Sequence, residues 1–179
     1  MTDLTKFSNE ELGLIVSVPY RVGVWVSNVD DNTGSKIDDR NERKALEATI
    51  SALASKSQKL PFAAAIMGEV EKNKAVWPSW DNATSSDVIL TDVEKAIIIC
   101  KEKASAGAVK QYKKTIWQVG IVVAQAYGEQ VDPDNEMHVN RFFQWMGSMG
   151  GGAKLGKNPE NMSDKEKQAL NKLRQILKK

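Results

Sequence analysis

Apolar residues along most of the chain recur every three or four positions, and strict alternation of apolar and polar residues is scarce. This spacing gathers apolar side chains on one face of an α-helix. The pattern therefore predicts an all-α protein, a bundle of about six or seven helices.

The first predicted helix opens at Ser8 and runs through an apolar stretch to about Val29. Ser8 and Glu11 have the spacing of a capping box, which satisfies the free amides at a helix start. Pro19 lies inside the stretch and is expected to kink the helix or divide it. The many valines favour a buried strand as the competing interpretation, but the stretch is long for one strand and contains no turn.

The other helices are predicted from caps and helix breakers. Pro61 suits the first turn of a helix, and WPSWDNATSSD is typical of a turn-rich loop. Thr91 and Glu94 are expected to cap the helix that follows this loop. The predicted helices are Asp38 to about Ser55, Phe62 to about Val76, Thr91 through Cys100, Gly107 to about Tyr127, and Asp132-Pro133 through Met146.

The C-terminal part differs from the rest of the chain. GSMGGGAKLG holds five of the twelve glycines and predicts a flexible linker. After it, Ser163 and Glu166 form a second capping-box pattern, and Leu170, Leu173, Ile176 and Leu177 share one helical face. The sequence thus predicts a helical domain over residues 1–150, followed by a Gly-rich linker and an amphipathic helix over 151–179.

Charge is divided between these two parts. The whole chain carries 25 basic and 23 acidic residues, but residues 153–179 carry eight basic and three acidic ones. The terminal helix is expected to pack on the body, or to contact a membrane surface or a partner protein. Its candidate contact residues are Lys165, Lys167, Lys172, Arg174, Lys178 and Lys179.

Composition excludes several classes of function. The only cysteine, Cys100, rules out a disulfide framework and fits a reducing cytoplasm, and it is expected to be a small core residue. The only histidine, His138, makes His-rich metal sites improbable.

The five tryptophans are expected in the core, with an exposed recognition patch at Trp77 and Trp80 as the alternative. The basic tail could touch nucleic acid, but the acidic body and the lack of a recognition module argue against it.

An internal repeat is the most specific signal in the sequence. Residues 33–42, TGSKIDDRNE, align without gaps with residues 127–136, YGEQVDPDNE. A structural explanation covers each repeated position: glycine ends one helix, the aliphatic residue packs, aspartate caps the next helix and glutamate follows in its first turn. The repeated positions are Gly34, Ile37, Asp38, Asn41 and Glu42 in the first turn, and Gly128, Val131, Asp132, Asn135 and Glu136 in the second.

The same turns allow a second interpretation, the binding of a divalent cation such as calcium. Oxygen ligands are dense in the first turn, as hard cations prefer. The register of an EF-hand fails there, because Ser35 stands where that loop needs glycine and Asn41 where it needs a bidentate glutamate. The candidate ligands are Asp30, Asp31, Asn32, Asp38, Glu42, Asp132 and Glu136. No cofactor is required by the sequence.

The stretch VGIVVAQAYGEQVDPDNEMHVNRF resembles the signature of the tellurite-resistance TerB-like family, and LIVSVPYRVGVWVSNVDDNTGSKIDDRNERKAL is similar to the family's first copy of that unit. The resemblance covers residues 8–150. It implies an all-helical domain of two pseudo-symmetric halves. Thr33 and Tyr127 stand where the family has aspartate before glycine, which bears on any ion site carried over from the family.

The resemblance also implies a function. It indicates a non-enzymatic cytoplasmic protein of tellurite resistance or a related stress response, which binds other proteins at or near the inner membrane surface. The alternative hypothesis is an adaptor that docks on a membrane surface or a protein through its basic C-terminal helix. A metal-dependent hydrolase on a helical scaffold is a third and remoter hypothesis.

Overall fold

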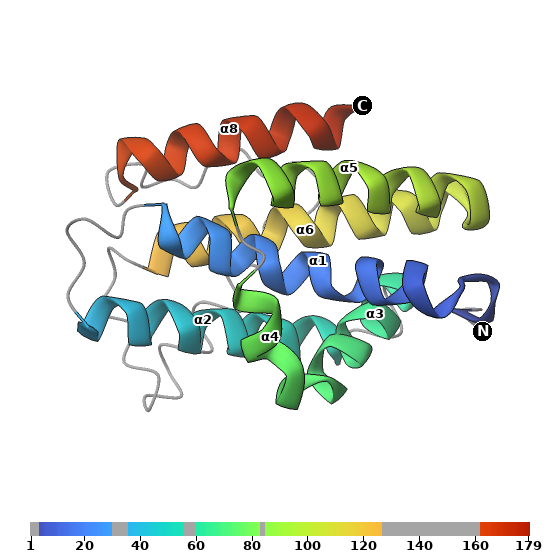
Figure 1. The fold of residues 1–179 in the computed structure, drawn as a ribbon, viewed down its shortest axis with the longest axis horizontal. Coiled ribbons are helices and arrows are strands. Elements are labelled where there is room, and N and C mark those ends of the chain that lie inside the picture. Colours follow the sequence, from blue (N-terminus) through green and yellow to red (C-terminus); the bar gives the residue numbers. More distant parts are fainter. Residues whose placement is uncertain (1–3, 30–35, 56–59, 83–84, 127–161) are drawn as a thin grey trace.

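A computed structural model describes residues 4–29, 36–55, 60–82, 85–126 and 162–179, with the backbone alone at 36–42 and 126. These residues form α-helices and two short 3-10 turns, with no strand among them (Figure 1). The expected all-α bundle is therefore confirmed. The α-helices are α1 (Asn9–Asn28), α2 (Lys36–Ala54), α3 (Pro61–Lys72), α4 (Trp77–Asp81), α5 (Ser86–Lys103), α6 (Ala106–Ala126) and α8 (Asp164–Lys178).

Both predicted capping boxes are present. At the start of α1, the Ser8 hydroxyl accepts a hydrogen bond from the Glu11 amide at 3.2 Å, and the Glu11 carboxylate accepts one from the Ser8 amide at 2.7 Å. Ser163 and Glu166 make the same reciprocal pair at the start of α8. Pro61 occupies the first turn of α3 as expected, where its missing N–H costs nothing.

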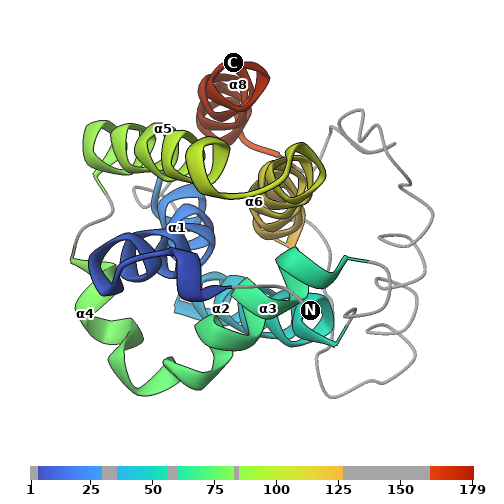
Figure 2. The same cartoon turned by 90° about the vertical axis from the view of Figure 1, so that its right-hand side faces the viewer.

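Helix α1 lies at the centre of the bundle. It contacts each of the other described α-helices, and Figure 2 shows it between α5 on one side and α2 and α3 on the other. Twelve consecutive residues, Ile15–Val26, are buried. A helix surrounded on all sides has to be apolar on all sides, so the valine-rich stretch that resembles a buried strand is a buried helix.

Pro19 does not divide α1, which stays helical from Asn9 to Asn28. Proline has no N–H, so it cannot donate the usual helical bond to the carbonyl of Ile15, four residues earlier. The buried hydroxyl of Tyr112 on α6 donates to that carbonyl instead, at 2.8 Å. A side chain 97 residues away thus replaces the missing hydrogen bond.

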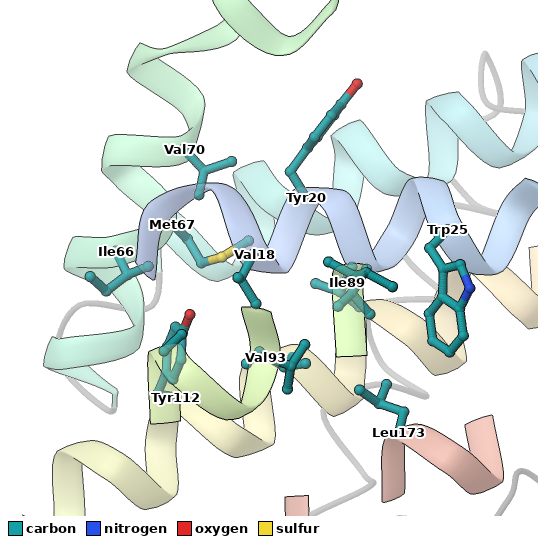
Figure 3. Close-up of a cluster of buried hydrophobic side chains, with 14 of the residues drawn as sticks. Val18, Tyr20, Trp25, Ile66, Met67, Val70, Ile89, Val93, Tyr112 and Leu173 are labelled. Atoms are coloured by element: carbon teal, nitrogen blue, oxygen red, sulfur yellow. The ribbon is translucent and has the colours of Figure 1, made fainter. Parts of the chain in front are cut away.

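The core is continuous across the bundle. Aliphatic and aromatic side chains from α1, α3, α5, α6 and α8 meet around α1 (Figure 3). Figure 3 labels ten of them: Val18, Tyr20, Trp25, Ile66, Met67, Val70, Ile89, Val93, Tyr112 and Leu173.

Helix α8 packs on the body, as one of the sequence interpretations proposed. It contacts α1, α5 and α6, and it buries Leu170 and Leu173 in the common core (Figure 1). The close approach depends on Gly120 of α6. A β-carbon at Gly120 would lie 3.2 Å from a Leu170 methyl and 3.3 Å from a Leu173 methyl.

Several predicted boundaries were wrong. Helix α2 begins at Lys36, so Asp38 lies inside the first turn and is not the N-cap. Helix α5 begins at Ser86, five residues before the predicted cap; Thr91 is interior, and its hydroxyl donates to the Asp87 carbonyl at 2.7 Å. The predicted loop at WPSWD is the short helix α4, with Pro78 in its first turn.

Other expectations concern residues that the structure does not describe. The helix expected from Asp132 to Met146 and the Gly-rich linker at 147–156 lie outside the described residues. The second copy of the repeat and the predicted boundary near residue 150 also lie there. The two pseudo-symmetric halves therefore remain a prediction.

A double-mutant cycle can test whether the Tyr112 hydroxyl replaces the backbone amide that Pro19 lacks. Tyr112→Phe leaves the buried Ile15 carbonyl without a partner and should lower the free energy of unfolding by about 1–3 kcal/mol in urea titrations. In a Pro19→Ala background, the new amide can donate to the same carbonyl, so Tyr112→Phe should cost less than about 1 kcal/mol. An equal cost in both backgrounds would contradict this explanation.

The close packing of α8 against Gly120 gives a second prediction. Gly120→Leu overpacks the contact with Leu170 and Leu173 and should destabilise the protein by about 1–3 kcal/mol. It should also open α8 to limited proteolysis. Gly13→Leu is the matched control, because a side chain there meets nothing within 4 Å. That control should be neutral or stabilise slightly. Equal protease resistance of α8 in both variants would refute the close packing.

Candidate functional site

The residues predicted to bind a cation lie mostly outside the described residues. Those in α2 have only their backbone described. Within the part of the chain whose side chains are described, no three His, Cys, Asp or Glu residues gather where they could hold a metal ion. The cation site stays a prediction. Outside the described residues are Asp30, Asp31, Asn32, Gly34, Gly128, Val131, Asp132 and Glu136, and in the backbone-only part of α2 are Ile37, Asp38 and Glu42.

The basic residues predicted to contact a partner all lie on α8 or at its end. The helix turns Ala169, Leu170 and Leu173 into the core, so most of the basic residues lie on its exposed surface. Lys167 is half-buried. The exposed ones are Lys165, Lys172, Arg174, Lys178 and Lys179.

Only part of this positive charge is neutralised. Lys167 pairs with Asp164 at 3.4 Å, and Lys179 pairs with Glu94 of α5 at 2.9 Å. Lys172, Arg174 and Lys178 make no ion pair with any described residue. The outer surface of α8 therefore carries a net positive charge.

A lysine from α5 extends this surface. Lys101 of α5 donates a hydrogen bond to the backbone carbonyl of Lys179 at 2.9 Å, at the negative end of the α8 dipole. Burial, together with the positive charge of Lys101, lowers the pKa of Lys113 on α6. The contact between Lys101 and Lys179 was not predicted, because nothing local marks a residue 78 positions away as a neighbour.

Inside the bundle, ionic and polar contacts join α1 to α5. Arg21 and Asp92 form an ion pair at 2.8 Å, and the arginine side chain is 7% exposed. The indole N–H of Trp25 donates to the Ser86 hydroxyl at 2.9 Å. These residues were not predicted, and only the charge of Arg21 within an otherwise apolar stretch signals a required partner.

A cluster of aromatic and charged side chains joins α1, α2 and α4. The Tyr20 hydroxyl donates to one oxygen of Asp81 at 2.8 Å, and Arg43 pairs with the other at 3.2 Å. The ring of Tyr20 stacks on Trp77 with centroids 4.6 Å apart, and Trp80 lies edge-on at 5.8 Å. Burial and the hydrogen bond to Asp81 raise the pKa of Tyr20.

This cluster shows whether Trp77 and Trp80 lie in the core or form an exposed patch. Trp77 is only 3% exposed and belongs to the core, as the main interpretation had it. Trp80 is half-buried against it. The exposed recognition patch that was the alternative is therefore not present at Trp77.

Cys100 is buried in the core, which confirms the prediction. Burial raises its pKa to about 12, so the thiol stays protonated near neutral pH and is a poor nucleophile. His138 lies outside the described residues.

Comparisons of the chain with protein-family models, characterised proteins and solved structures found no match. The TerB-like resemblance thus rests on the residues of the two repeated turns. Among the helices of the described residues, none has both the length and the apolar character needed to cross a membrane.

The contact between the ends of α1 and α5 predicts a pH dependence. Lys103 donates to the Glu11 carboxylate at 2.6 Å, and this bond, with that from the Ser8 amide, holds the pKa of Glu11 below its usual value. A carboxylate with a lowered pKa stabilises the fold above its unfolded pKa and loses that contribution as the pH falls. Glu11→Gln should therefore flatten the loss of stability between about pH 5 and pH 3.

The control for this pH effect is Glu10→Gln. Glu10 is exposed in the same turn and makes no ion pair with a described residue. Its variant should keep the acid dependence of the wild type in melting curves recorded across this pH range. Identical profiles for Glu11→Gln and the wild type would show that the contact with Lys103 does not stabilise the fold.

Proposed function

We propose that this protein is a non-catalytic TerB-like interaction protein that acts in tellurite resistance or a related stress response by binding other proteins. Its support from the sequence is the repeated turn at residues 33–42 and 127–136, which resembles the family signature.

The observation that supports the non-catalytic part is that several charged side chains among the described residues pair across helices. Arg21 with Asp92, and Lys103 with Glu11, hold α1 against α5. Asp81 joins α1, α2 and α4 through hydrogen bonds from Tyr20 and Arg43. A catalytic acid or base needs access to a substrate proton, whereas these groups are engaged with other helices.

A rigid helical scaffold with charged surfaces is suited to binding partners. The acidic repeat and the basic α8 carry opposite charge in one chain, so a partner can be selected by charge complementarity. Under this proposal, the charged surface turns bind the partner, and the helical bundle holds these turns in position.

The stress-response proposal is tested by deletion and complementation in the source organism. Loss of the protein should lower tellurite tolerance, and the wild type should restore it. The variant Asp132→Asn/Glu136→Gln should fail to restore it if the acidic turn binds the partner. Asp87→Asn/Glu10→Gln removes two exposed acidic residues outside the turns and should restore it fully. Unchanged tolerance in the deletion strain would contradict the proposal.

Calcium binding by the acidic turns is tested separately with the purified protein. If the first turn forms a site, millimolar calcium should raise the melting temperature by a few degrees, on the order of the effect of a ligand at 100 times its Kd. Asp30→Asn/Asp38→Asn/Glu42→Gln should abolish the rise, and Asp87→Asn should leave it intact. No rise in the wild type would remove the calcium site, while leaving partner binding open to the complementation test.

A further inference from the structure

The outer face of α8 has an ordered arrangement of charge. Seven residues make almost two helical turns, so side chains seven positions apart lie in one row. Lys165, Lys172 and Lys179 form one row, and Lys167 and Arg174 begin a second that Lys178 continues. Between the rows lie the exposed residues Asp164, Gln168, Asn171 and Gln175, of which Asp164 alone is charged.

Three cations of this basic face lack an ion-pair partner among the described residues, and a lysine of α5 extends the face. Lys101 adds positive charge from α5. Lys172, Arg174 and Lys178 make no ion pair with described residues. Lys172 lies on one flank of the exposed surface of α8, and Arg174 and Lys178 lie on the other. An extended anionic surface that reaches both flanks would neutralise these three cations.

The chemistry of the face favours lipid headgroups over a protein partner. Protein interfaces are enriched in aromatic residues, Met and Arg and depleted in Lys, whereas the exposed face of α8, with Lys179 at its end, carries four exposed lysines, one arginine and no aromatic residue. Lysine is a hydrated point charge on a flexible stem and does not require the fixed geometry of a carboxylate partner. A bilayer surface rich in anionic lipid attracts such clusters without a shaped pocket.

We propose that the outer face of α8, together with Lys101, binds the headgroups of anionic phospholipids at a bilayer surface. The binding is electrostatic and peripheral. An inserting amphipathic helix uses its apolar face, but in α8 that face is occupied by the contact with Gly120 and the core. The helix therefore stays docked while its basic rows meet the membrane, and salt should release the protein.

The test uses the full chain and sedimentation with two kinds of vesicle, phosphatidylcholine alone and phosphatidylcholine with 30 mol% phosphatidylglycerol, about the anionic content at which basic clusters bind. Binding is expected only to the anionic vesicles at low salt. Lys172→Gln/Arg174→Gln/Lys178→Gln should weaken it at least 100-fold, since each basic residue near the surface contributes roughly fivefold.

The matched control removes the same charge elsewhere. Lys6→Gln/Lys44→Gln/Lys72→Gln changes residues on the first 3-10 turn, α2 and α3, and it should bind within about twofold of the wild type because charges beyond a Debye length are screened. Equal losses in the two triple variants would show that net charge, and not this face, governs binding. That result would overturn the proposal.

Other outcomes also decide the question. Absence of binding to anionic vesicles at low salt would overturn the proposal. Binding that survives high salt would also overturn it, because it would indicate insertion of an apolar face. Binding to polyglutamate or to duplex DNA without binding to vesicles would assign the face to an acidic protein or a nucleic acid. The proposal is independent of the proposed stress function: the acidic-turn variants should bind vesicles normally, and the α8 variant should keep any calcium response.

Discussion

The central constraint on this fold is that α1 is enclosed on every side and must satisfy its backbone without water. A buried carbonyl with no donor is costly, and Pro19 creates one at Ile15. The Tyr112 hydroxyl fills that need from α6. Because the bond has one donor and one acceptor, it fixes the lengthwise register of α6 on α1, which apolar packing alone leaves loosely specified. The proline that should break the helix thereby becomes the point at which a neighbouring helix is positioned.

The remaining helices are placed around α1 by the same combination of close packing and single polar contacts. The ion pair of Arg21 with Asp92 and the bond from Trp25 to Ser86 position α5. Gly120 lets the leucines of α8 approach α6 closely. Once the apolar face of α8 is used in this way, its lysine rows are what the helix presents outward. The surface chemistry of the C-terminal helix is thus a consequence of how its other face packs.

Local signals in the sequence were sufficient where the cause is local. The capping boxes at Ser8 and Ser163 and the proline of α3 were predicted and confirmed, because each depends on residues within one helical turn. The cap expected at Thr91 was wrong because a threonine hydroxyl can also bond the carbonyl four residues back inside a helix. The apolar spacing of Ile89, Val93 and Ile97 continues through that position and indicates one longer helix. The contacts of Tyr112, Asp92 and Lys101 join residues 71 to 97 positions apart, and no local pattern predicts such pairs.

Native-state hydrogen exchange tests most directly whether α8 is part of the same cooperative unit as α1. The account predicts that the amides of Val18 to Val26 and those of Ala169 to Leu173 exchange only through global unfolding, with the same free energy and the same dependence on denaturant. Exchange of the α8 amides at a free energy several kcal/mol below that of α1 would contradict it. Such a result would mean that the helix leaves the body readily and exposes its leucines together with its lysines.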